Sequence, residues 1–422
     1  MHGVSSFKMN AEHRARIESC CDAVIHKINM SILWPKLLQR EIFYPDDVNI
    51  PEWTNDLGNE DIKRNIFLNI RTRGPNAFVN LCDSLRETGH TEIATLLENG
   101  QMASDKIISK SHISNVQEEE DFEELHDRFY TVLKKTNTPL QVKVKKATQF
   151  FDDPAENPFV ARYRMRSNPR GYALIIVNID FGRNQSFRVG AEHDAENTKQ
   201  LFTQMGFKVF LFRDLSAKNM ETQIKEFAQK DFTHVDSSFV IISSHGSQCT
   251  DTDFNNTLIT GTDGDKISCD SIMEFFTASA CPTLAGKPKV FIFQVCRGEQ
   301  VQCAVKRTVS DTHMSDYPNW ISFPKQTIRN YDDMFEVYST LSGFVSLRDT
   351  VNGSWYIQVL CEVFMNHAHS RHILDLLHEV ESRLATLRTN INICQTAVVT
   401  LKGITKHCYL HPGLFEDDQA KS

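Results

Sequence analysis

Two hydrophobic periodicities divide the chain near residue 160. Before this point apolar residues recur at intervals of three and four, as at Ile62, Ile66 and Ile70, which is typical of helices that pack through one face. After it, short continuous apolar runs alternate with helical patterns. The sequence therefore predicts an all-α domain followed by an α/β domain.

The first hundred residues are predicted to form a compact bundle of short helices. One helix is expected to end at Gly74, the next to begin at Pro75, and that second helix to end at Gly89. Further short apolar helices are predicted in AVIHKI, ILWPKLLQ and TEIATLLEN. From residue 101 to 158 the pattern fails, and the charged stretch QEEEDFEELHDR favours a solvated linker there.

The second domain is predicted to contain a mostly parallel sheet with helices on both faces. Its strands are expected at ALIIVNI, KVFLF, SSFVIISSHG and KVFIFQVC, with helices such as VGAEHDAENTKQLFTQM between them. Chemistry in such sheets gathers at the carboxyl ends of the strands. His245 ends one of these runs and Cys296 ends another, so both are expected at the same rim of the sheet.

A cysteine and a histidine at one rim favour nucleophilic catalysis. A thiol with a pKa of about 8.5 is mostly protonated at neutral pH, so a nucleophilic Cys296 requires a base, and His245 is the candidate. The backbone N–H groups of Gly246 and Cys296 could form an oxyanion hole. Either side chain alone is more often structural, and the pair on matched strand ends favours the catalytic interpretation.

Composition excludes several classes of function. The net charge of −8 argues against a general nucleic-acid binder, and no segment reaches the roughly 18 apolar residues that span a membrane. The N-terminus lacks a signal-peptide core, so a cytoplasmic protein is expected. The 11 cysteines form no CxxC pair, which favours reduced thiols over disulfides or a metal site. Neither a metal nor an organic cofactor is implied.

The segment around Cys296 resembles the local signature of caspases. Gln294-Val295-Cys296-Arg297-Gly298, preceded by His245-Gly246, matches that signature with Val in place of the usual Ala. The similarity extends over roughly residues 160–412 and includes RVGAEHDAENTKQLF. The first hundred residues look like a caspase recruitment domain (CARD), most clearly in RTRGPNAFVNLCDSLRETGHTEIATLL. Together they resemble an initiator caspase, of the apical apoptotic type that caspase nine and insect Dronc represent.

This resemblance implies a fold and a set of boundaries. The expected fold is an all-α six-helix death-fold bundle, followed by an α/β caspase-like domain with a mostly parallel central sheet flanked by helices. The expected boundaries are 1–100 for the recruitment domain, 101–158 for the linker, 159–311 for the large subunit, 312–330 for the inter-subunit linker and 331–422 for the small subunit.

The resemblance also implies a substrate pocket. In caspases two arginines and a glutamine line the pocket for the P1 side chain, the substrate residue before the cleaved bond, and they correspond here to Arg188, Gln294 and Arg348. Guanidinium groups hold a carboxylate in a bidentate manner, so the pocket would select Asp. Read singly, either arginine is more often part of a surface ion pair.

Backbone contacts along an extended substrate are expected from Ser346 and Arg348. Val345 and Leu347 stand where many caspases have Tyr and Trp, which leaves the preference beyond P1 open. The resemblance assigns the orientation of the His245 imidazole to the carbonyl of Ser186.

Activation by self-cleavage and assembly is the further implication. Asp311 and Asp316 lie in a polar stretch suited to cleavage, Asp311 being the preferred site, and linker residues such as Asp105 and Asp121 are further candidates. Near the C-terminus, CQTAVVTL and KHCYLHPG predict two more strands, the first of which forms the dimer seam in the family. The chain is thus expected to form a homodimer of large and small subunit pairs.

The expected partners follow from the same resemblance. They are a CARD-containing adaptor or apoptosome-type scaffold, protein substrates with Asp at P1 such as effector caspases and the chain itself, and inhibitor-of-apoptosis proteins. Neither nucleic acid nor membrane is expected as a partner. Docking of the recruitment domain is assigned to three arginines opposite acidic residues, namely Arg64, Arg71 and Arg73 opposite Asp46, Asp47 and Asp56.

Three functions remain after this comparison. The favoured one is an initiator cysteine endopeptidase, made as a zymogen, that cleaves after Asp and starts apoptosis. The alternatives are a catalytically silent scaffold or regulator and an inflammatory-type caspase. The presence of both His245 and Cys296 weighs against the scaffold.

Overall fold

The computed structural model describes most of the chain. The described residues are 9–43, 47, 49–99, 140–152, 161–182, 187–249, 256–303, 329–389 and 392–416. Both predicted self-cleavage sites and Ser186 lie outside them, as do the linker candidates Asp105 and Asp121. None of the described helices is long and apolar enough to cross a membrane.

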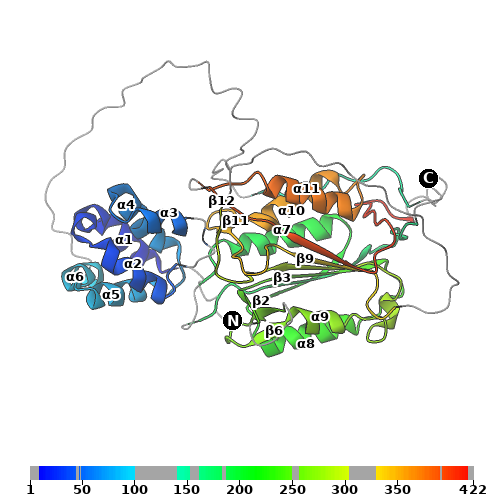
Figure 1. The fold of residues 1–422 in the computed structure, drawn as a ribbon, viewed down its shortest axis with the longest axis horizontal. Helices are drawn as coiled ribbons and strands as arrows, with labels where there is room; N and C mark the ends of the chain where they lie inside the picture. Colours follow the sequence, from blue (N-terminus) through cyan, green and yellow to red (C-terminus); the bar gives the residue numbers. More distant parts are fainter. Residues whose placement is uncertain are drawn as a thin grey trace, which may run out of the picture.

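Six α-helices form the N-terminal domain within the described residues (Figure 1). They are α1 (Ala11–Val24), α2 (Met30–Gln39), α3 (Ile50–Asn55), α4 (Glu60–Asn69), α5 (Ala77–Glu87) and α6 (Thr91–Asn99), with short 3₁₀ helices at Ile25–Lys27 and Ile70–Thr72. Their buried apolar faces share one core, which includes Ile66, Ile70, Leu81 and Leu85. The predicted six-helix bundle is confirmed.

Two glycines at the helix ends have different roles. Gly89 follows α5 with a φ of +81°, as a helix-ending glycine requires. At Gly74 an added Cβ would lie 2.6 Å from Cβ of Phe187, a residue of the α/β domain. Glycine at position 74 therefore allows close contact between the two domains. The sequence pattern predicted only that it ends a helix.

The structure corrects two of the expected docking residues of the recruitment domain, Arg73 and Asp47, and Asp46 lies outside the described residues. Nη1 of Arg73 lies 2.7 Å from Oδ2 of Asp47, and both side chains are buried. A buried charge without a partner costs free energy, so each of these residues compensates the charge of the other. Neither is exposed for docking to a partner. Arg64 and Arg71 form ion pairs at the surface with Asp22 and Glu18, and docking through these two arginines stays a prediction.

A six-stranded sheet forms the centre of the second domain. Its strands, in spatial order, are β13 (Val398–Lys402), β9 (Met334–Tyr338), β7 (Lys289–Gln294), β3 (Ser237–Ser243), β1 (Gly171–Val177) and β2 (Lys208–Arg213). All neighbours are parallel except β13, which runs antiparallel to β9. The predicted mostly parallel sheet is confirmed, and all four apolar runs named above form strands in it.

Helices cover both faces of this sheet (Figure 1). One face carries α7 (Ala191–Gln204), α10 (Trp355–His367) and α11 (Ile373–Leu384), and the other carries α8 (Ala217–Ala228) and α9 (Cys269–Glu274). Each layer has its own apolar core, because alternate side chains of every strand point to opposite faces.

Short strands extend the loops at the carboxyl end of the sheet. They are β4 (Gly246–Gln248), β5 (Thr257–Thr260) and β6 (Lys266–Ser268), β8 (Gln302–Cys303) with β12 (Ile393–Cys394), and β10 (Arg348–Asp349) with β11 (Gly353–Ser354). The strand predicted at KHCYLHPG is wrong. Only isolated bridges occur there, at His407 and Tyr409, and the positive φ of His411 (+44°) turns the backbone away from an extended course.

Part of the expected linker belongs to the α/β domain. The N–H of Lys145 donates to the carbonyl of Met365 (2.8 Å), and that of Ala147 donates to the carbonyl of Pro412 (2.9 Å). Val142 is buried in the core beneath α7 and α10. The prediction of a solvated linker is therefore wrong for residues 140–152, which backbone hydrogen bonds and the buried Val142 and Ala147 side chains attach to the domain.

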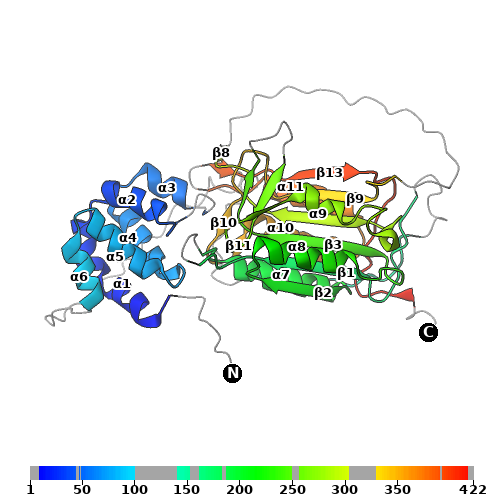
Figure 2. The same ribbon diagram turned by 90° about the horizontal axis from the view of Figure 1, so that it is seen from below.

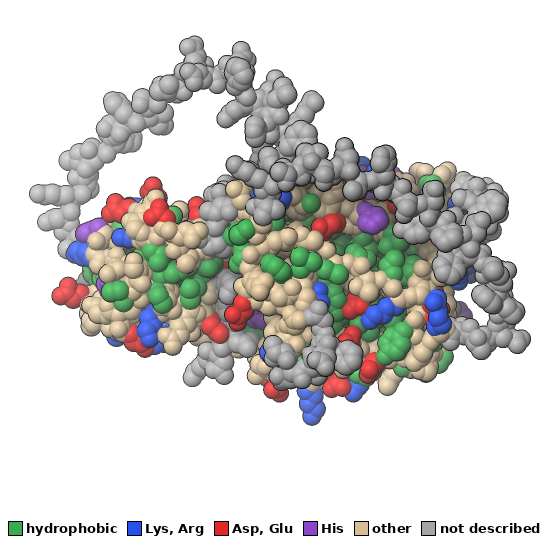
Figure 3. All heavy atoms as spheres, viewed as in Figure 1, with side chains coloured by type: hydrophobic (Ala, Val, Ile, Leu, Met, Phe, Trp, Pro, Cys, Tyr) green, Lys and Arg blue, Asp and Glu red, His purple; other side chains and the backbone are tan. Residues whose placement is uncertain are grey.

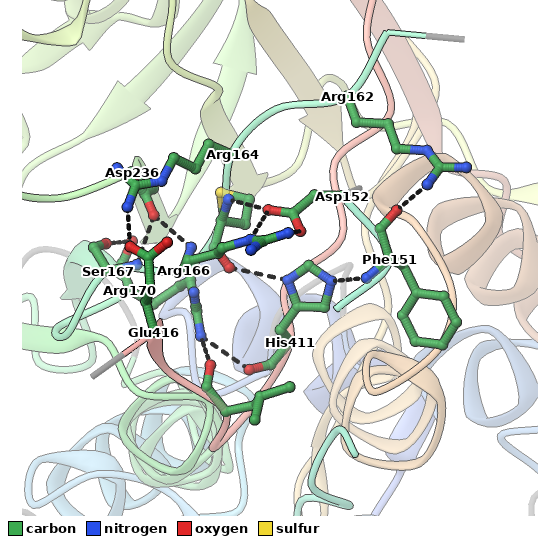
Figure 4. A network of polar contacts seen from close by, with 12 residues as sticks. Phe151, Asp152, Arg162, Arg164, Arg166, Ser167, Arg170, Asp236, His411 and Glu416 are labelled. Atoms are coloured by element: carbon green, nitrogen blue, oxygen red, sulfur yellow. Dashed lines mark hydrogen bonds and ion pairs between the residues drawn. The ribbon is translucent and has the colours of Figure 1, made fainter. Parts of the chain in front are cut away.

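A buried polar network closes the amino end of the sheet (Figure 4). Arg170, which precedes β1, donates to the backbone carbonyls of His411 and Leu414. The His411 ring contacts the carbonyl of Met165 through Nδ1 (2.9 Å) and accepts from the N–H of Phe151 through Nε2 (2.8 Å). The network joins segments from both sides of the predicted inter-subunit linker, so it would hold the two subunits together after cleavage.

Charges of both signs are mixed on one face of the molecule. On the face shown in Figure 3, acidic and basic side chains lie among polar and apolar atoms, and neither sign forms a continuous stripe where the described residues are visible.

Candidate active site

The carboxyl ends of β3 and β7 bring His245 and Cys296 to one rim. Ser243 is opposite Gln294 in the parallel ladder, and the N–H of Ser244 donates to the carbonyl of Gln294 (3.2 Å). His245 and Cys296 each follow two residues after that matched pair. The two side chains therefore arise from neighbouring strands at the same level of the sheet.

Gly246 permits the close approach of these two strand ends. An added Cβ at this position would lie 2.7 Å from the carbonyl oxygen of Cys296 and 2.8 Å from Cβ of Val295. Any larger residue would push the backbone after His245 away from Cys296. The glycine is thus required by packing, whether or not its N–H contacts an oxyanion.

His245 is buried and held through its main chain. Its carbonyl accepts from the N–H of Thr260 (2.9 Å) on β5, and its ring centroid lies 4.6 Å from that of Phe181, which follows β1. These contacts come from both sides and restrict the backbone and the imidazole together.

The Cys296 side chain is half-buried beside the segment that leads into β10. The N–H of Ser346 lies within hydrogen-bonding distance of Sγ, with an N to S separation of 3.4 Å. The contact fixes the position of the sulfur relative to this segment. The same contact places the nucleophile candidate against the expected substrate-binding segment.

Contacts of Arg297 and Gly298 fix the turn that follows Cys296. The guanidinium of Arg297 lies 4.0 Å from the centroid of the Tyr338 ring, and its Nε donates to Oγ1 of Thr257 (2.9 Å). Gly298 has a φ of +154°, and an added Cβ there would lie 2.2 Å from the carbonyl oxygen of Gly343. The Arg-Gly pair after the cysteine therefore has a structural reason in this turn.

Two of the predicted pocket residues line the same rim. Arg188 is buried and donates to the carbonyl of Asn178 (2.8 Å) and to Oγ of Ser243 (3.1 Å). Gln294 donates to Oγ of Ser346 (2.8 Å). Both contacts fix polar side chains close to the strand ends that carry His245 and Cys296.

Arg348 completes the group at the start of β10. Its side chain is buried, with Nη2 3.7 Å from Oδ1 of Asp47. Ser346, two residues earlier, has its hydroxyl 2.8 Å from that of Ser339 at the end of β9. The structure therefore gathers His245, Cys296, Gly246, Arg188, Gln294, Ser346 and Arg348 around the carboxyl ends of β1, β3, β7 and β9.

The sequence did not predict two residues that support the pocket. Asp194 on α7 is fully buried and accepts from the N–H (2.8 Å) and the hydroxyl (2.5 Å) of Ser354. Burial raises the pKa of Asp194, and the Ser354 hydrogen bonds and the charges of Arg188 and Arg348 act to lower it. This carboxylate links both pocket arginines electrostatically.

Gln395 is the second supporting residue. Its amide oxygen accepts from the N–H of Leu347 (2.6 Å), and its amide nitrogen donates to the carbonyl of Ser339 (2.7 Å). It thereby fixes the segment that carries Ser346 and Arg348. The sequence marks neither residue, because Asp194 is one of several acidic residues in a polar helix and Gln395 is one polar residue before a strand.

The chemistry available at this rim is that of a thiol, an imidazole and buried guanidinium groups. Across the described part of the chain, no group of three or more His, Cys, Asp or Glu residues is arranged to hold a metal ion. The arrangement is suited to attack by sulfur on a carbonyl next to a negatively charged side chain.

Comparison with known proteins decides the family. The caspase domain family matches residues 170–409. The chain belongs to the caspase family. It is 29% identical over 401 residues to human Caspase-9, covering 89% of this chain and 94% of that protein. It is 29% identical to Caspase-2 of Gallus gallus (82% of this chain, 84% of that protein) and 25% identical to Caspase Dronc of Drosophila melanogaster (84% of each).

These matches cover the helical domain as well as the caspase domain. The chain is therefore a cysteine protease of the initiator-caspase type, with a helical recruitment domain before the catalytic domain.

Proposed function

We propose that this caspase is an initiator endopeptidase that cleaves peptide bonds after Asp and starts apoptosis by processing effector caspases. The observation that carries the proposal is the rim itself, where His245 and Cys296 follow matched residues of β3 and β7 and buried Arg188 and Arg348 lie around them. A buried guanidinium is best compensated by a carboxylate, which supports selection of Asp.

The proposed reaction uses Cys296 as nucleophile and His245 as base. His245 takes the thiol proton, and the sulfur attacks the main-chain carbonyl carbon of the P1 Asp, whose bond to the next residue's nitrogen is then broken. The N–H groups of Gly246 and Cys296 stabilise the oxyanion. The imidazolium gives its proton to the leaving amine, and water, deprotonated by the same imidazole, then hydrolyses the thioester.

The proposed pocket residues bind two parts of the substrate, the P1 carboxylate and the main chain. Arg188 and Arg348 bind the P1 carboxylate, and the amide of Gln294 completes its contacts. Ser346 and Arg348 also bind the main chain of the extended substrate. An Asn at P1 would leave the guanidinium groups without a countercharge, so the pocket would reject it.

Activation is proposed to require assembly and self-cleavage. A scaffold that binds the recruitment domain raises the local concentration of zymogens, and dimerisation orders the catalytic rim. The edge strand β13 supports this, because it is paired on one side with β9 and exposes Val399 and Leu401. Cleavage after Asp311 or Asp316 would then divide the chain into a large and a small subunit that stay associated, and inhibitor-of-apoptosis proteins are further proposed partners.

The P1 preference tests this function directly. Fluorogenic peptides that differ only at P1 (Asp, Glu, Asn, Lys) are assayed with the full chain, both dilute and in a sulfate salt that favours association. We expect turnover of the Asp peptide that rises on association. Equal turnover of all four peptides, or none with a folded dimer, would contradict the proposal.

The dimer seam has its own test. Leu401→Glu places a charge on the exposed face of β13, and we expect it to shift the protein to monomer in sedimentation analysis and to lower the association-dependent activity. Lys406→Glu, on the same C-terminal segment but outside β13, is the control. An unchanged dimer in Leu401→Glu would remove β13 from the interface.

A further inference from the structure

The recruitment domain contacts the pocket of its own chain through Asp47. This residue lies between α2 and α3 and is only 1% exposed, and its backbone forms an isolated parallel bridge with that of Arg348. Figures 1 and 2 both show the helical domain at the end of the sheet where β10 and β11 lie. Asp47 is thus the point at which this domain reaches a proposed P1 pocket residue.

The Asp47 carboxylate lies between arginines of two domains. Oδ2 accepts from Nη1 of Arg73 at 2.7 Å, and Oδ1 lies 3.7 Å from Nη2 of Arg348. Arg73 is itself buried, with its guanidinium 4.5 Å from the centroid of the Phe43 ring. The recruitment domain therefore holds the carboxylate with its own arginine and presents it to Arg348.

Packing on the other side of the pocket supports the same docking. Phe187, next to Arg188, lies so close to Gly74 that a side chain at position 74 would not fit. A polar cleft between the domains is lined by Arg40, Arg73 and Asn76 from one side and by Asp180 and Phe187 from the other. The recruitment domain thus covers the approach to both proposed pocket arginines.

We propose that Asp47 is an intramolecular occupant of the P1 pocket, through which the recruitment domain holds the zymogen inactive. The inference rests on the proposed role of Arg348 in that pocket. Asp47 presents the same chemical group as a P1 Asp, so the two carboxylates compete for one guanidinium. Because both domains belong to one chain, this competition is independent of protein concentration.

The docking and the active site are then reciprocally coupled. A partner that binds the recruitment domain only when this domain has moved away from the pocket frees Arg348. By linkage, a ligand that fills the pocket weakens the docking of the recruitment domain by the same factor by which the docking weakens ligand binding. Recruitment would therefore act in two ways, by clustering the zymogens and by removing Asp47.

Asp47→Asn in the full chain tests the occupant. The substitution keeps the shape and removes the charge, and Asp61→Asn, exposed in the first turn of α4, is the matched control. Hydrolysis of the Asp peptide is measured in sulfate salt at one protein concentration. We expect kcat/KM to rise by about tenfold in Asp47→Asn, within the usual range for coupled sites, and to stay unchanged in Asp61→Asn.

The outcomes separate this inference from the proposed function. Equal and substantial activity in the wild type and both variants would overturn the occupant and leave the protease intact. Absence of Asp-selective turnover in all three would overturn the protease and the occupant with it. Self-cleavage between residues 47 and 48, detected by mass spectrometry, would make Asp47 a substrate site and would also overturn the inhibitory role.

Hydrogen exchange on the unmodified protein gives a second test that needs no variant. The N–H of Ile50 donates to the carbonyl of Asp47 (3.1 Å), so exchange in α3 reports on this turn. A peptide ending in Asp aldehyde is expected to accelerate exchange there by about fivefold or more, and one ending in Asn aldehyde to leave it unchanged. Unchanged exchange with an Asp aldehyde that inhibits the enzyme would overturn the proposal.

Discussion

The two ends of the central sheet hold the same three residue types in different settings. Each end has a buried arginine, a histidine and a cysteine, namely Arg188, His245 and Cys296 at the carboxyl end and Arg170, His411 and Cys408 at the amino end. At the amino end, backbone groups engage both ring nitrogens of the histidine, and burial lowers its pKa to about 4. At the carboxyl end, the cysteine is half-buried and receives an N–H from a neighbouring segment.

The difference shows that residue type alone does not decide whether a side chain is available for reaction. The end of the strand at which the side chain lies and its access to solvent decide this. Cys408 is fully buried, and burial raises the pKa of its thiol, which keeps it protonated and inert. Cys296 lies where parallel strands end and loops begin, so a substrate can meet it. The comparison can be tested by equivalent substitutions at the two ends.

The largest expected effect is loss of the nucleophile. Cys296→Ala should lower kcat on the Asp peptide by a factor on the order of 10⁶, as loss of a catalytic nucleophile does in another protease. Cys408→Ala should keep the activity and lower the free energy of unfolding by about 1 kcal/mol through lost packing. Activity assays and urea unfolding of both variants check this, and residual turnover in Cys296→Ala would remove it from the nucleophile role.

The pocket arginine should give the next largest effect. Arg188→Gln removes a buried charge that would meet the substrate carboxylate, and kcat/KM for the Asp peptide should fall by roughly 100-fold, equivalent to about 3 kcal/mol. The fall should be much smaller for an Asn peptide. Arg213→Gln, exposed at the end of β2, is the control. A proportional loss on both peptides would indicate damage to the fold, because Arg188 also holds the carbonyl of Asn178.

At the amino end, the histidine should affect stability alone. His411→Phe keeps an aromatic ring and leaves the N–H of Phe151 and the carbonyl of Met165 without their partner. We expect the free energy of unfolding to fall by about 2 kcal/mol at pH 7, with Asp selectivity unchanged. A changed P1 preference in this variant would contradict the separation of the two ends.

The pH dependence of stability should carry the signature of the same histidine. The folded pKa of about 4 lies below the ordinary value of 6.5, so the unfolded chain binds a proton that the folded chain refuses. Stability from His411 is therefore full above pH 6.5 and is lost as the pH falls toward 4. Between pH 7 and pH 5 we expect a loss of about 2 kcal/mol that is missing in His411→Gln. Equal losses in the two proteins, measured by urea unfolding, would assign the pH dependence to other groups.

Sequence patterns predicted the sheet and the rim because both depend on local order. A run such as KVFIFQVC predicts a buried strand and its end together, so Cys296 could be placed without tertiary information. The position of His245 followed in the same way. The resemblance to caspases supplied the P1 roles, which spacing alone did not give.

The missed features depend on contacts between distant segments. Asp194 and Ser354 are 160 residues apart in the chain, and their hydrogen bond leaves no local pattern. Residues 140–152 lack an apolar period that could predict their attachment to the domain. Backbone hydrogen bonds to the carbonyls of Met365 and Pro412 hold them there, and such bonds leave no pattern in the sequence. The contact of Asp47 with Arg348 likewise joins two domains that the sequence pattern treats separately.

Covalent trapping shows whether Cys296 is the nucleophile and whether the pocket beside it selects Asp. The full chain is treated with a peptide that ends in Asp and carries a thiol-reactive ketone, and the adduct is located by mass spectrometry, with the Asn peptide as control. We expect one adduct on Cys296, formed with the Asp peptide and strongly reduced in Arg188→Gln. Equal labelling by both peptides, or adducts at the exposed Cys303 in place of Cys296, would contradict it.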